Sequence, residues 1–183
     1  MKNPLPLRAA DFDFALPPER IAQGPARPRD SARLLVVGRD HLHDETIAAL
    51  PGLLRPGDLM VVNDTQVIPA RLSARRGQAR IGLLLNRNEG SGRWHALVRN
   101  ARRLRAGDVL QIEGTDDCTA TVLAAPDQGA VLLDFGPDPA ALARALEQAG
   151  EVPLPPYISR PHGPRPEDTA DYQSIFAERP GAV

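Results

Sequence analysis

The chain has 183 residues, 42% of them hydrophobic, and its 22 basic and 23 acidic side chains leave a formal net charge of −1. Its single cysteine, Cys118, excludes an intrachain disulfide, and no stretch approaches the roughly 20 apolar residues of a membrane span. The N-terminus shows no apolar secretory segment, so we expect a cytoplasmic protein that has no membrane partner.

The first segment, residues 1–68, has the rhythm of a β-α-β unit. Two apolar runs, RLLVV at 33–37 and DLMVVND at 58–64, predict buried strands. A short helical stretch over 45–54, interrupted at Pro51, lies between them. We therefore interpret this segment as the first part of an α/β domain.

The second segment, residues 69–136, is set apart by its lack of proline. All 19 prolines lie at or before Pro69 or at or after Pro126, so residues 70–125 contain none. Proline cannot donate to a strand ladder, and its exclusion is typical of central strands. Short aliphatic and β-branched runs separated by glycines predict an inserted small antiparallel β-barrel, among them RIGLLL, WHALVR, DVLQIE and TATVLAA.

The third segment, residues 137–183, returns to helix and loop. The run PDPAALARALEQAG predicts a helix that ends at Gly150, and the proline-rich EVPLPPYISRPHGPRP predicts an extended loop. A short helix is expected around TADYQSIFAE. The fold class that follows is an α+β multidomain chain, in which a discontinuous α/β domain holds an inserted β-barrel.

The predicted barrel has an uneven distribution of charge. Residues 71–105 hold ten arginines and one acid, Glu89, whereas residues 108–138 hold seven acids and no base. A dense run of arginines suits an RNA backbone, because guanidinium groups bind phosphate bidentately. Antiparallel neighbours could instead pair the basic strands with the acidic ones. Trp94, the one aromatic residue within 70–125, cannot by itself form a platform for stacking several bases.

Signatures of phosphate-binding loops and metalloproteases are absent from the sequence. It holds no GxxxxGK[ST], GxGxxG or HExxH motif and no closely spaced pair of cysteines. His41 and His43 could share one face of a strand, but without a third ligand they favour a solvated turn. We predict no metal site.

Polar residues interrupt the apolar stretch LMVVNDTQVIPARL at Asn63, Asp64 and Thr65. Small polar residues at the end of a strand suit ligand binding in α/β proteins, where strand ends line a crevice. The alternative is an Asx-turn, in which Asn63 or Asp64 folds onto nearby backbone amides. In QGPARPRDSAR, Asp30 and Arg33 flank the start of a predicted strand, and a local ion pair would explain them equally well.

Four stretches together resemble the S-adenosylmethionine:tRNA ribosyltransferase-isomerase family of queuosine biosynthesis. They follow in order and at the family's spacing along the whole chain: DFDFALPPERIAQGPARPRDSARLLVV, RPGDLMVVNDTQVIPARL, EVPLPPYISRP and DYQSIFAERPGAV. The resemblance implies the same division into a discontinuous α/β domain and an inserted β-barrel. It covers the N-terminal half of the family's length, so we expect the C-terminal half of the α/β domain to be missing.

The resemblance also implies a reaction and its partners. Family members move the ribosyl moiety of S-adenosylmethionine to 7-aminomethyl-7-deazaguanine at the tRNA wobble position, which forms epoxyqueuosine and releases adenine and methionine. S-adenosylmethionine would be a co-substrate, with no metal or prosthetic group, and the tRNA would bind through its anticodon region. The family's sulfonium acidifies the C5′ protons, so that a positioned base can open the sugar.

The site residues that the resemblance implies fall into three groups. Asn63, Asp64 and Thr65 would share the ligand crevice, with Asp64 in a polar catalytic role. The remaining substrate-binding candidates are Asp30, Arg33 and Arg71 for the donor or a tRNA phosphate, Pro155, Pro156, Tyr157 and Arg160 for a loop closing over the modified base, and Tyr172 and Gln173 lining the same cleft. Purely structural packing would explain Tyr157 and Tyr172 equally well.

Three positions depart from the family pattern. Gln66 stands in place of an arginine, Gly82 in place of a glutamate and Ala32 in place of a serine. Losing an arginine that binds an anion forfeits a charge-assisted bond of about 1.5 to 3 kcal/mol. The alternatives to an active enzyme are a non-catalytic RNA-binding fragment, and a chain that associates with a second one through the exposed, incomplete α/β domain.

Overall fold

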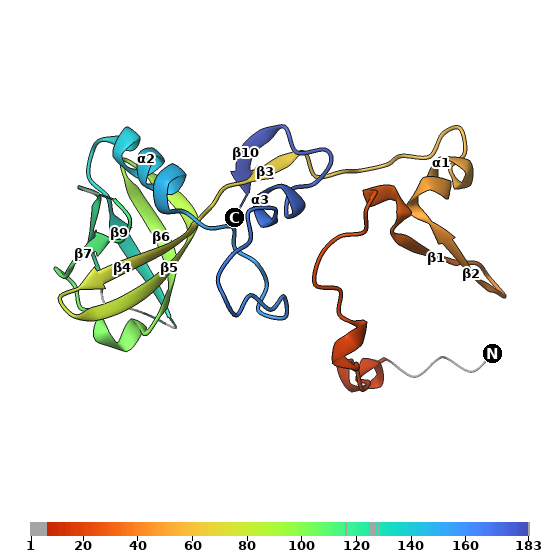
Figure 1. Ribbon diagram of the computed structural model, residues 1–183, viewed down its shortest axis with the longest axis horizontal. Coiled ribbons are helices and arrows are strands. Elements are labelled where there is room, and N and C mark those ends of the chain that lie inside the picture. Colours follow the sequence, from red (N-terminus) through yellow and green to blue (C-terminus); the bar gives the residue numbers. More distant parts are fainter. Residues whose placement is uncertain (1–6, 116, 125–126, 128, 183) are drawn as a thin grey trace. The chain divides into compact units, whose positions relative to one another are not determined.

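A computed structural model describes residues 7–115, 117–124, 127 and 129–182 of the chain (Figure 1). The chain divides into two compact units. The first comprises Met1–Arg55 and Pro156–Ser159, and the second comprises Pro56–Pro155 and Arg160–Val183. The segment boundaries 1–68, 69–136 and 137–183 remain predictions, because this division by contacts follows a different criterion.

The second unit contains the predicted β-barrel, which is closed and antiparallel with the strand order β4-β5-β6-β9-β8-β7. Hairpins join β4 to β5 and β5 to β6, and the second of these turns at Ser91 and Gly92. The strands are β4 (Arg71–Arg76), β5 (Ala79–Gly90), β6 (Arg93–Arg99), β7 (Val109–Ile112), β8 (Thr119–Val122) and β9 (Ala130–Asp134).

The barrel closes because alternate residues of its strands are apolar and point inward. In β4 and β5 the buried positions follow a period of two, and β7, β8 and β9 repeat it. Every strand contributes to one core, made by Leu72, Ala74, Ile81, Leu83, Leu85, Ala96, Leu110, Ile112, Ala120, Val122, Val131 and Leu133.

Helix α2 (Pro139–Ala149) forms where the sequence predicts it and packs Leu142 and Ala145 into the barrel core. Asp138 caps its first turn by accepting a hydrogen bond from the backbone nitrogen of Ala140 at 2.9 Å. The helix ends at Gly150, where the surrounding backbone leaves no room for a side chain. A Cβ atom there would lie 2.3 Å from the Leu146 carbonyl oxygen and 2.4 Å from that of Pro69.

In the first unit, β1 (Arg33–Val37) pairs antiparallel with β2 (Leu42–Thr46) in a hairpin. The 3₁₀ helix η4 (Ile47–Ala49) and the short helix α1 (Leu50–Leu53) follow, so the predicted helical stretch exists in shortened form. The other elements of this unit are the 3₁₀ helices η1 (Ala9–Phe12), η2 (Pro18–Arg20) and η3 (Arg29–Ser31).

The β-α-β interpretation of residues 1–68 is wrong in this structure. Residues 58–64 form no strand, and Leu59 and Val61 are 87% and 85% exposed. The RLLVV strand forms, but its residues alternate between exposed and half-buried. A strand needs a neighbouring strand for its backbone and a layer for its face, and among the described residues no strand pairs with residues 59–62, whose side chains are exposed.

A second sheet in the second unit consists of β3 (Thr65–Val67) and β10 (Arg179–Ala182), which pair in parallel with a register shift at Gly181. The predicted helix around TADYQSIFAE is shorter than expected. Helix α3 spans only Asp168–Asp171, and beyond it the Ser174 hydroxyl accepts a hydrogen bond from the backbone nitrogen of Phe176 at 3.1 Å.

Candidate functional site

The polar triplet Asn63, Asp64 and Thr65 lies where the chain enters β3. The side-chain oxygen of Asn63 accepts hydrogen bonds from the Thr65 backbone nitrogen, at 2.8 Å, and from the Thr65 hydroxyl. The Asx-turn alternative is therefore confirmed for Asn63. Asn63 is exposed and the other two residues are half-buried, so the triplet is open to a ligand and not enclosed in the core.

Asp64 is tied to β10 through its backbone and faces solvent with its side chain. Its carbonyl oxygen accepts hydrogen bonds from the backbone nitrogens of Glu178, at 2.8 Å, and Arg179, at 3.1 Å. Its carboxylate lies 3.7 Å from the guanidinium of Arg179, and the two side chains are 49% and 81% exposed. An ion pair this long and this exposed contributes little to stability, so the carboxylate stays available to a substrate.

The amide of Gln173 holds the strand next to this triplet. Its Nε2 donates to the Val67 carbonyl oxygen at 2.9 Å, and its Oε1 accepts from the Val67 backbone nitrogen at 2.8 Å. Both bonds are partly buried and cross 106 positions of sequence. Gln173 therefore positions β3, while its neighbour Tyr172 is half-buried.

Arg160 and Asp168 form the most buried ion pair among the described residues, with side chains 11% and 2% exposed. Nη2 of Arg160 donates to Oδ1 at 2.6 Å, and its Nε donates to Oδ2 at 2.8 Å and to Oδ1 at 3.1 Å. The Arg165 backbone nitrogen also donates to Oδ2, at 2.7 Å. The hydrogen bonds from Arg160, followed by the one from Arg165, hold the pKa of Asp168 at about 2, below its usual 3.8.

Arg71 joins the barrel to the start of the proline-rich loop. Its Nη2 donates to the Leu154 carbonyl oxygen at 3.1 Å, next to Pro155. Its backbone exchanges two hydrogen bonds with Glu151, at 3.0 and 2.9 Å. The first residue of β4 therefore fixes where the loop leaves the barrel.

The first unit holds the other predicted binding residues, namely Asp30, Arg33, Pro156 and Tyr157. Asp30 is exposed within η3, and Arg33 lies 3.4 Å from the Asp44 carboxylate in a solvent-exposed ion pair. The ion-pair partner of Arg33 is thus Asp44 on the neighbouring strand and not Asp30, so this contact differs from the local ion pair that the sequence suggested. Tyr157 is 60% exposed.

Gln23 makes a clasp in the first unit that resembles the one made by Gln173 in the second. Its Nε2 donates to the Tyr157 carbonyl oxygen at 3.1 Å, and its Oε1 accepts from the Ser159 backbone nitrogen at 2.7 Å. Neither Gln23 nor Asp168 was predicted as a site residue. No local pattern marks them, because their partners lie 136 and eight positions away in the chain.

Barrel arginines and acids do pair across strands, as the alternative interpretation predicts. Glu113 on the connection after β7 binds Arg75 of β4, at 2.5 Å, and Arg80 of β5, at 2.9 Å. Asp108 binds Arg76 at 2.7 Å. The backbone hydrogen bond from Arg105, followed by the contact with Arg76, holds the pKa of Asp108 below its usual range. Burial by itself would raise the pKa of Glu113, but Arg75 and Arg80 together outweigh it and lower that pKa.

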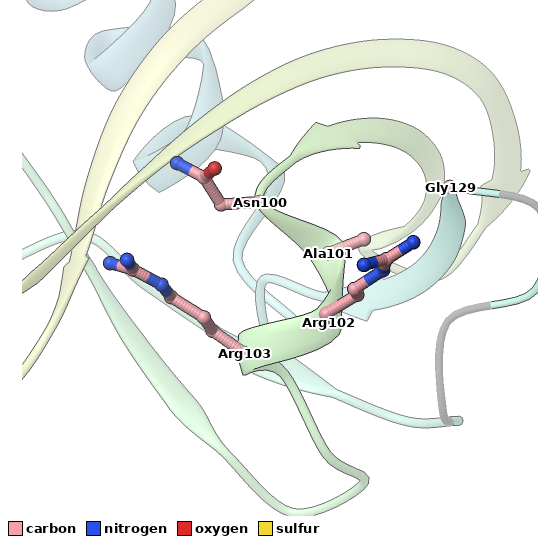
Figure 2. Close-up of a pocket in the computed structure, with 5 residues that line it drawn as sticks. All are labelled: Asn100, Ala101, Arg102, Arg103 and Gly129. Carbon is pink, nitrogen blue, oxygen red and sulfur yellow. The ribbon is translucent and has the colours of Figure 1, made fainter.

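Two of the surface depressions formed by the described residues lie on the barrel. One, of about 500 Å³, is lined by Asn100, Ala101, Arg102, Arg103 and Gly129 (Figure 2). The other, of about 310 Å³, is lined by Ser91, Arg93, Asp134, Gly136 and Pro137. Neither includes a site residue that the sequence predicts.

Nε2 of His43 lies within hydrogen-bonding distance of the Glu45 carboxylate, at 2.8 Å. Within residues 7–115, 117–124, 127 and 129–182, no group of three or more histidine, cysteine or acidic side chains could hold a metal ion. The helices in the same residues are all too short or too polar to cross a membrane.

Comparison with known proteins agrees with the motifs. The profile of a family described as queuosine biosynthesis protein matches residues 9–183. The chain belongs to this queuosine biosynthesis family. It is 57% identical over 176 residues to the S-adenosylmethionine:tRNA ribosyltransferase-isomerase of Gluconacetobacter diazotrophicus, and the match covers 96% of the chain and 49% of that protein.

Other relatives in the queuosine biosynthesis family give the same proportions. The enzyme of that name from Acidiphilium cryptum is 51% identical over 177 residues, which cover 97% of the chain and 51% of the relative. A solved S-adenosylmethionine tRNA ribosyltransferase structure from Thermotoga maritima is 38% identical, over 76% of the chain and 48% of that structure, with a TM-score of 0.39. The chain thus spans about half the length of these relatives.

The structure locates the three departures from the family pattern. Gln66 is an exposed residue of β3, so no cation stands at that point of the strand. Gly82 of β5 lies opposite Arg99 of β6, so Arg99 has no acid in that cross-strand position. Ala32 is half-buried between η3 and β1, and its carbonyl accepts a hydrogen bond from Ile47.

Proposed function

We propose that this chain carries part of the machinery that transfers the ribosyl moiety of S-adenosylmethionine to 7-aminomethyl-7-deazaguanine in the tRNA anticodon, forming epoxyqueuosine and releasing adenine and methionine. The observation that carries the proposal is the family match over residues 9–183, together with relatives named for this activity. Because the chain spans about half of those relatives, other groups of the complete site would come from further polypeptide.

The chemistry requires a polar group beside a sulfonium nucleoside. The positive sulfur acidifies the adjacent C5′ protons, and a base that removes one of them allows the sugar to open and adenine to leave. We assign this polar role to Asp64, because its carboxylate is accessible at the entrance to β3 and its backbone is fixed to β10. Water must be kept away from the opened sugar, which suits a site covered by loops.

The proline-rich loop is the natural cover in this proposal. Arg71 fixes its start, and the pair of Arg160 with Asp168 fixes its return to the second unit. Arg160 would thus act as a positioning residue, because its guanidinium is already bound to a carboxylate. Tyr157, with 60% of its surface exposed, stays a candidate for contact with the modified base.

Release of adenine tests the proposal directly. When the chain is mixed with the C-terminal half of the Gluconacetobacter diazotrophicus relative, S-adenosylmethionine and tRNA bearing 7-aminomethyl-7-deazaguanine, we expect free adenine, measured by chromatography, in amounts equal to the modified tRNA. Unmodified tRNA serves as the control and should release none. If no adenine forms during prolonged incubation while tRNA binding persists and weakens with salt, the chain is the alternative, a non-catalytic RNA-binding fragment.

We further propose that residues 59–62 belong to the discontinuous α/β domain and gain a neighbouring strand when more of that domain is present. Leu59, Met60, Val61 and Val62 are all exposed, although their sequence is typical of a buried strand. The adjacent β3 already pairs in parallel with β10. An exposed apolar strand-like segment beside a sheet is a site for strand addition.

Association with the missing half should depend on Val61. We expect the chain to bind the C-terminal half of the Gluconacetobacter diazotrophicus relative, and Val61→Asp to weaken that binding by at least about tenfold, since a buried charge is costly. Sedimentation velocity measures the complex. The matched control is Val109→Asp, at a valine of β7 that is 56% exposed. Equal loss with both variants, or no complex with the unaltered chain, would contradict this proposal.

A further inference from the structure

The ten arginines of residues 71–105 differ in whether they meet an acid. Four of them, all on β4 and β5, are in ion pairs: Arg75 and Arg80 with Glu113, Arg76 with Asp108, and Arg87 with Glu89. Each of these acids sits among arginines, so the positive charge of this face is largely compensated. A polyanion gains little by approaching it.

The arginines at the end of β6 and in the turn that follows it are in a different environment. Arg99, Arg102 and Arg103 are exposed, and within the residues that the structure describes none of them forms an ion pair. The backbone nitrogen of Arg105, the next arginine along the chain, donates a hydrogen bond to the Asp108 carboxylate at 2.7 Å. Three uncompensated charges therefore fall within five consecutive residues, 99–103.

A turn of defined shape presents these charges. Asn100 takes the left-handed conformation at φ 69°, and the 3₁₀ helix η5 (Ala101–Arg103) follows directly. The backbone carbonyl of Arg103 accepts a hydrogen bond from Arg76, which fastens the turn to β4. The turn borders the depression of about 500 Å³. The side chains of Arg102 and Arg103, which line it, point away from each other (Figure 2).

We propose that the segment Arg99–Arg103, the β6–η5 turn, binds the phosphate backbone of the tRNA. This inference rests on the proposed function, because it assumes that the partner is tRNA, and it assigns the contact to the barrel. Splayed guanidinium groups suit successive phosphates better than a single small anion. Trp94 of β6 is half-buried against the barrel core, so it adds no stacking platform. The turn would therefore position the RNA without reading its sequence.

The test compares two double variants with the same loss of charge. Arg102→Ala/Arg103→Ala removes two uncompensated arginines, and Arg75→Ala/Arg80→Ala removes two that share Glu113. Affinity for bulk tRNA is measured by fluorescence anisotropy at several salt concentrations. We expect the Arg102/Arg103 variant to bind about tenfold more weakly at low salt, with a salt slope reduced by roughly two, and the Arg75/Arg80 variant to bind within about twofold of the unaltered chain.

The outcomes separate this inference from the proposed function. Equal effects in the two double variants would mean that net charge alone governs binding, and no effect in the Arg102/Arg103 variant would place the RNA elsewhere. Either result overturns the inference and leaves adenine release unaffected. Absence of tRNA binding by the unaltered chain overturns the inference together with the RNA partner of the proposed function. Thermal unfolding of each variant shows whether the fold is intact.

Discussion

Asp168→Ala is expected to lower the melting temperature of the chain by on the order of 10 °C, measured by circular dichroism. The substitution leaves the Arg160 guanidinium, which is only 11% exposed, without the carboxylate that binds it through two nitrogens. It also leaves the Arg165 backbone nitrogen without its acceptor. Removing one partner of a buried ion pair costs more than the pair itself contributes, because an uncompensated charge remains in the interior.

Asp44→Ala is the matched control, since it also removes one carboxylate from an arginine–aspartate pair. Arg33 and Asp44 are 80% and 72% exposed, and water replaces the lost contact. We expect a change of melting temperature close to zero. Equal decreases of the melting temperature in both variants would show that burial of the Arg160 pair does not increase its contribution to stability.

The same pair gives the stability a defined dependence on pH. The pKa of Asp168 is about 2 in the folded chain and 3.8 in its usual environment, so the folded state binds fewer protons between these values. The stabilisation is fully present above about pH 4 and is lost as the pH falls through 2. In Asp168→Ala the stability should change less over this interval, and parallel acid titrations of the two chains test it.

Asp64→Asn is expected to slow adenine release by about 100-fold or more and to leave tRNA affinity within about twofold. Loss of a group that transfers a proton in the transition state lowers turnover by typically 10²–10⁴. Asparagine has nearly the same shape as aspartate but cannot accept that proton. Single-turnover kinetics with saturating S-adenosylmethionine separate the chemical step from binding.

Arg179→Ala provides the control for Asp64. It removes the same ion pair, 3.7 Å long, but keeps the carboxylate. If Asp64 acts in chemistry, Arg179→Ala should retain most of the turnover. Similar losses of turnover in both variants would assign the effect to the contact between the entrance of β3 and β10, and equal losses in turnover and tRNA binding would reject a catalytic role for Asp64.

The barrel and helix α2 could be predicted because their determinants are local. Alternating apolar residues give each barrel strand a buried face, and the absence of proline over 70–125 keeps every backbone donor available. Gly150 marks the end of α2 in the sequence as it does in the structure. The stretch over 58–64 has an equally apolar middle, but in the part of the chain that the structure describes no strand pairs with residues 59–62, so its prediction as a strand was wrong.

The polar triplet of the candidate site could be proposed from the sequence, whereas the contacts that hold it in place could not. Asn63, Asp64 and Thr65 stand out because three polar residues interrupt an apolar stretch. The Gln173 clasp on Val67 joins residues 106 positions apart, and glutamine in a loop carries no sign of such a bond. Asp168 resembles any exposed acid until Arg160 is seen beside it.

The sequence by itself determined that residues 71–105 are rich in arginine and which residues could face the barrel interior, because composition and periodicity are properties of the chain. Only the tertiary structure decided which arginines are compensated. Cross-strand contacts bring Glu113 to Arg75 and Arg80 and leave Arg102 and Arg103 open to solvent. Coulomb interactions depend on the distances between charges, and folding sets those distances between residues that are remote in the chain.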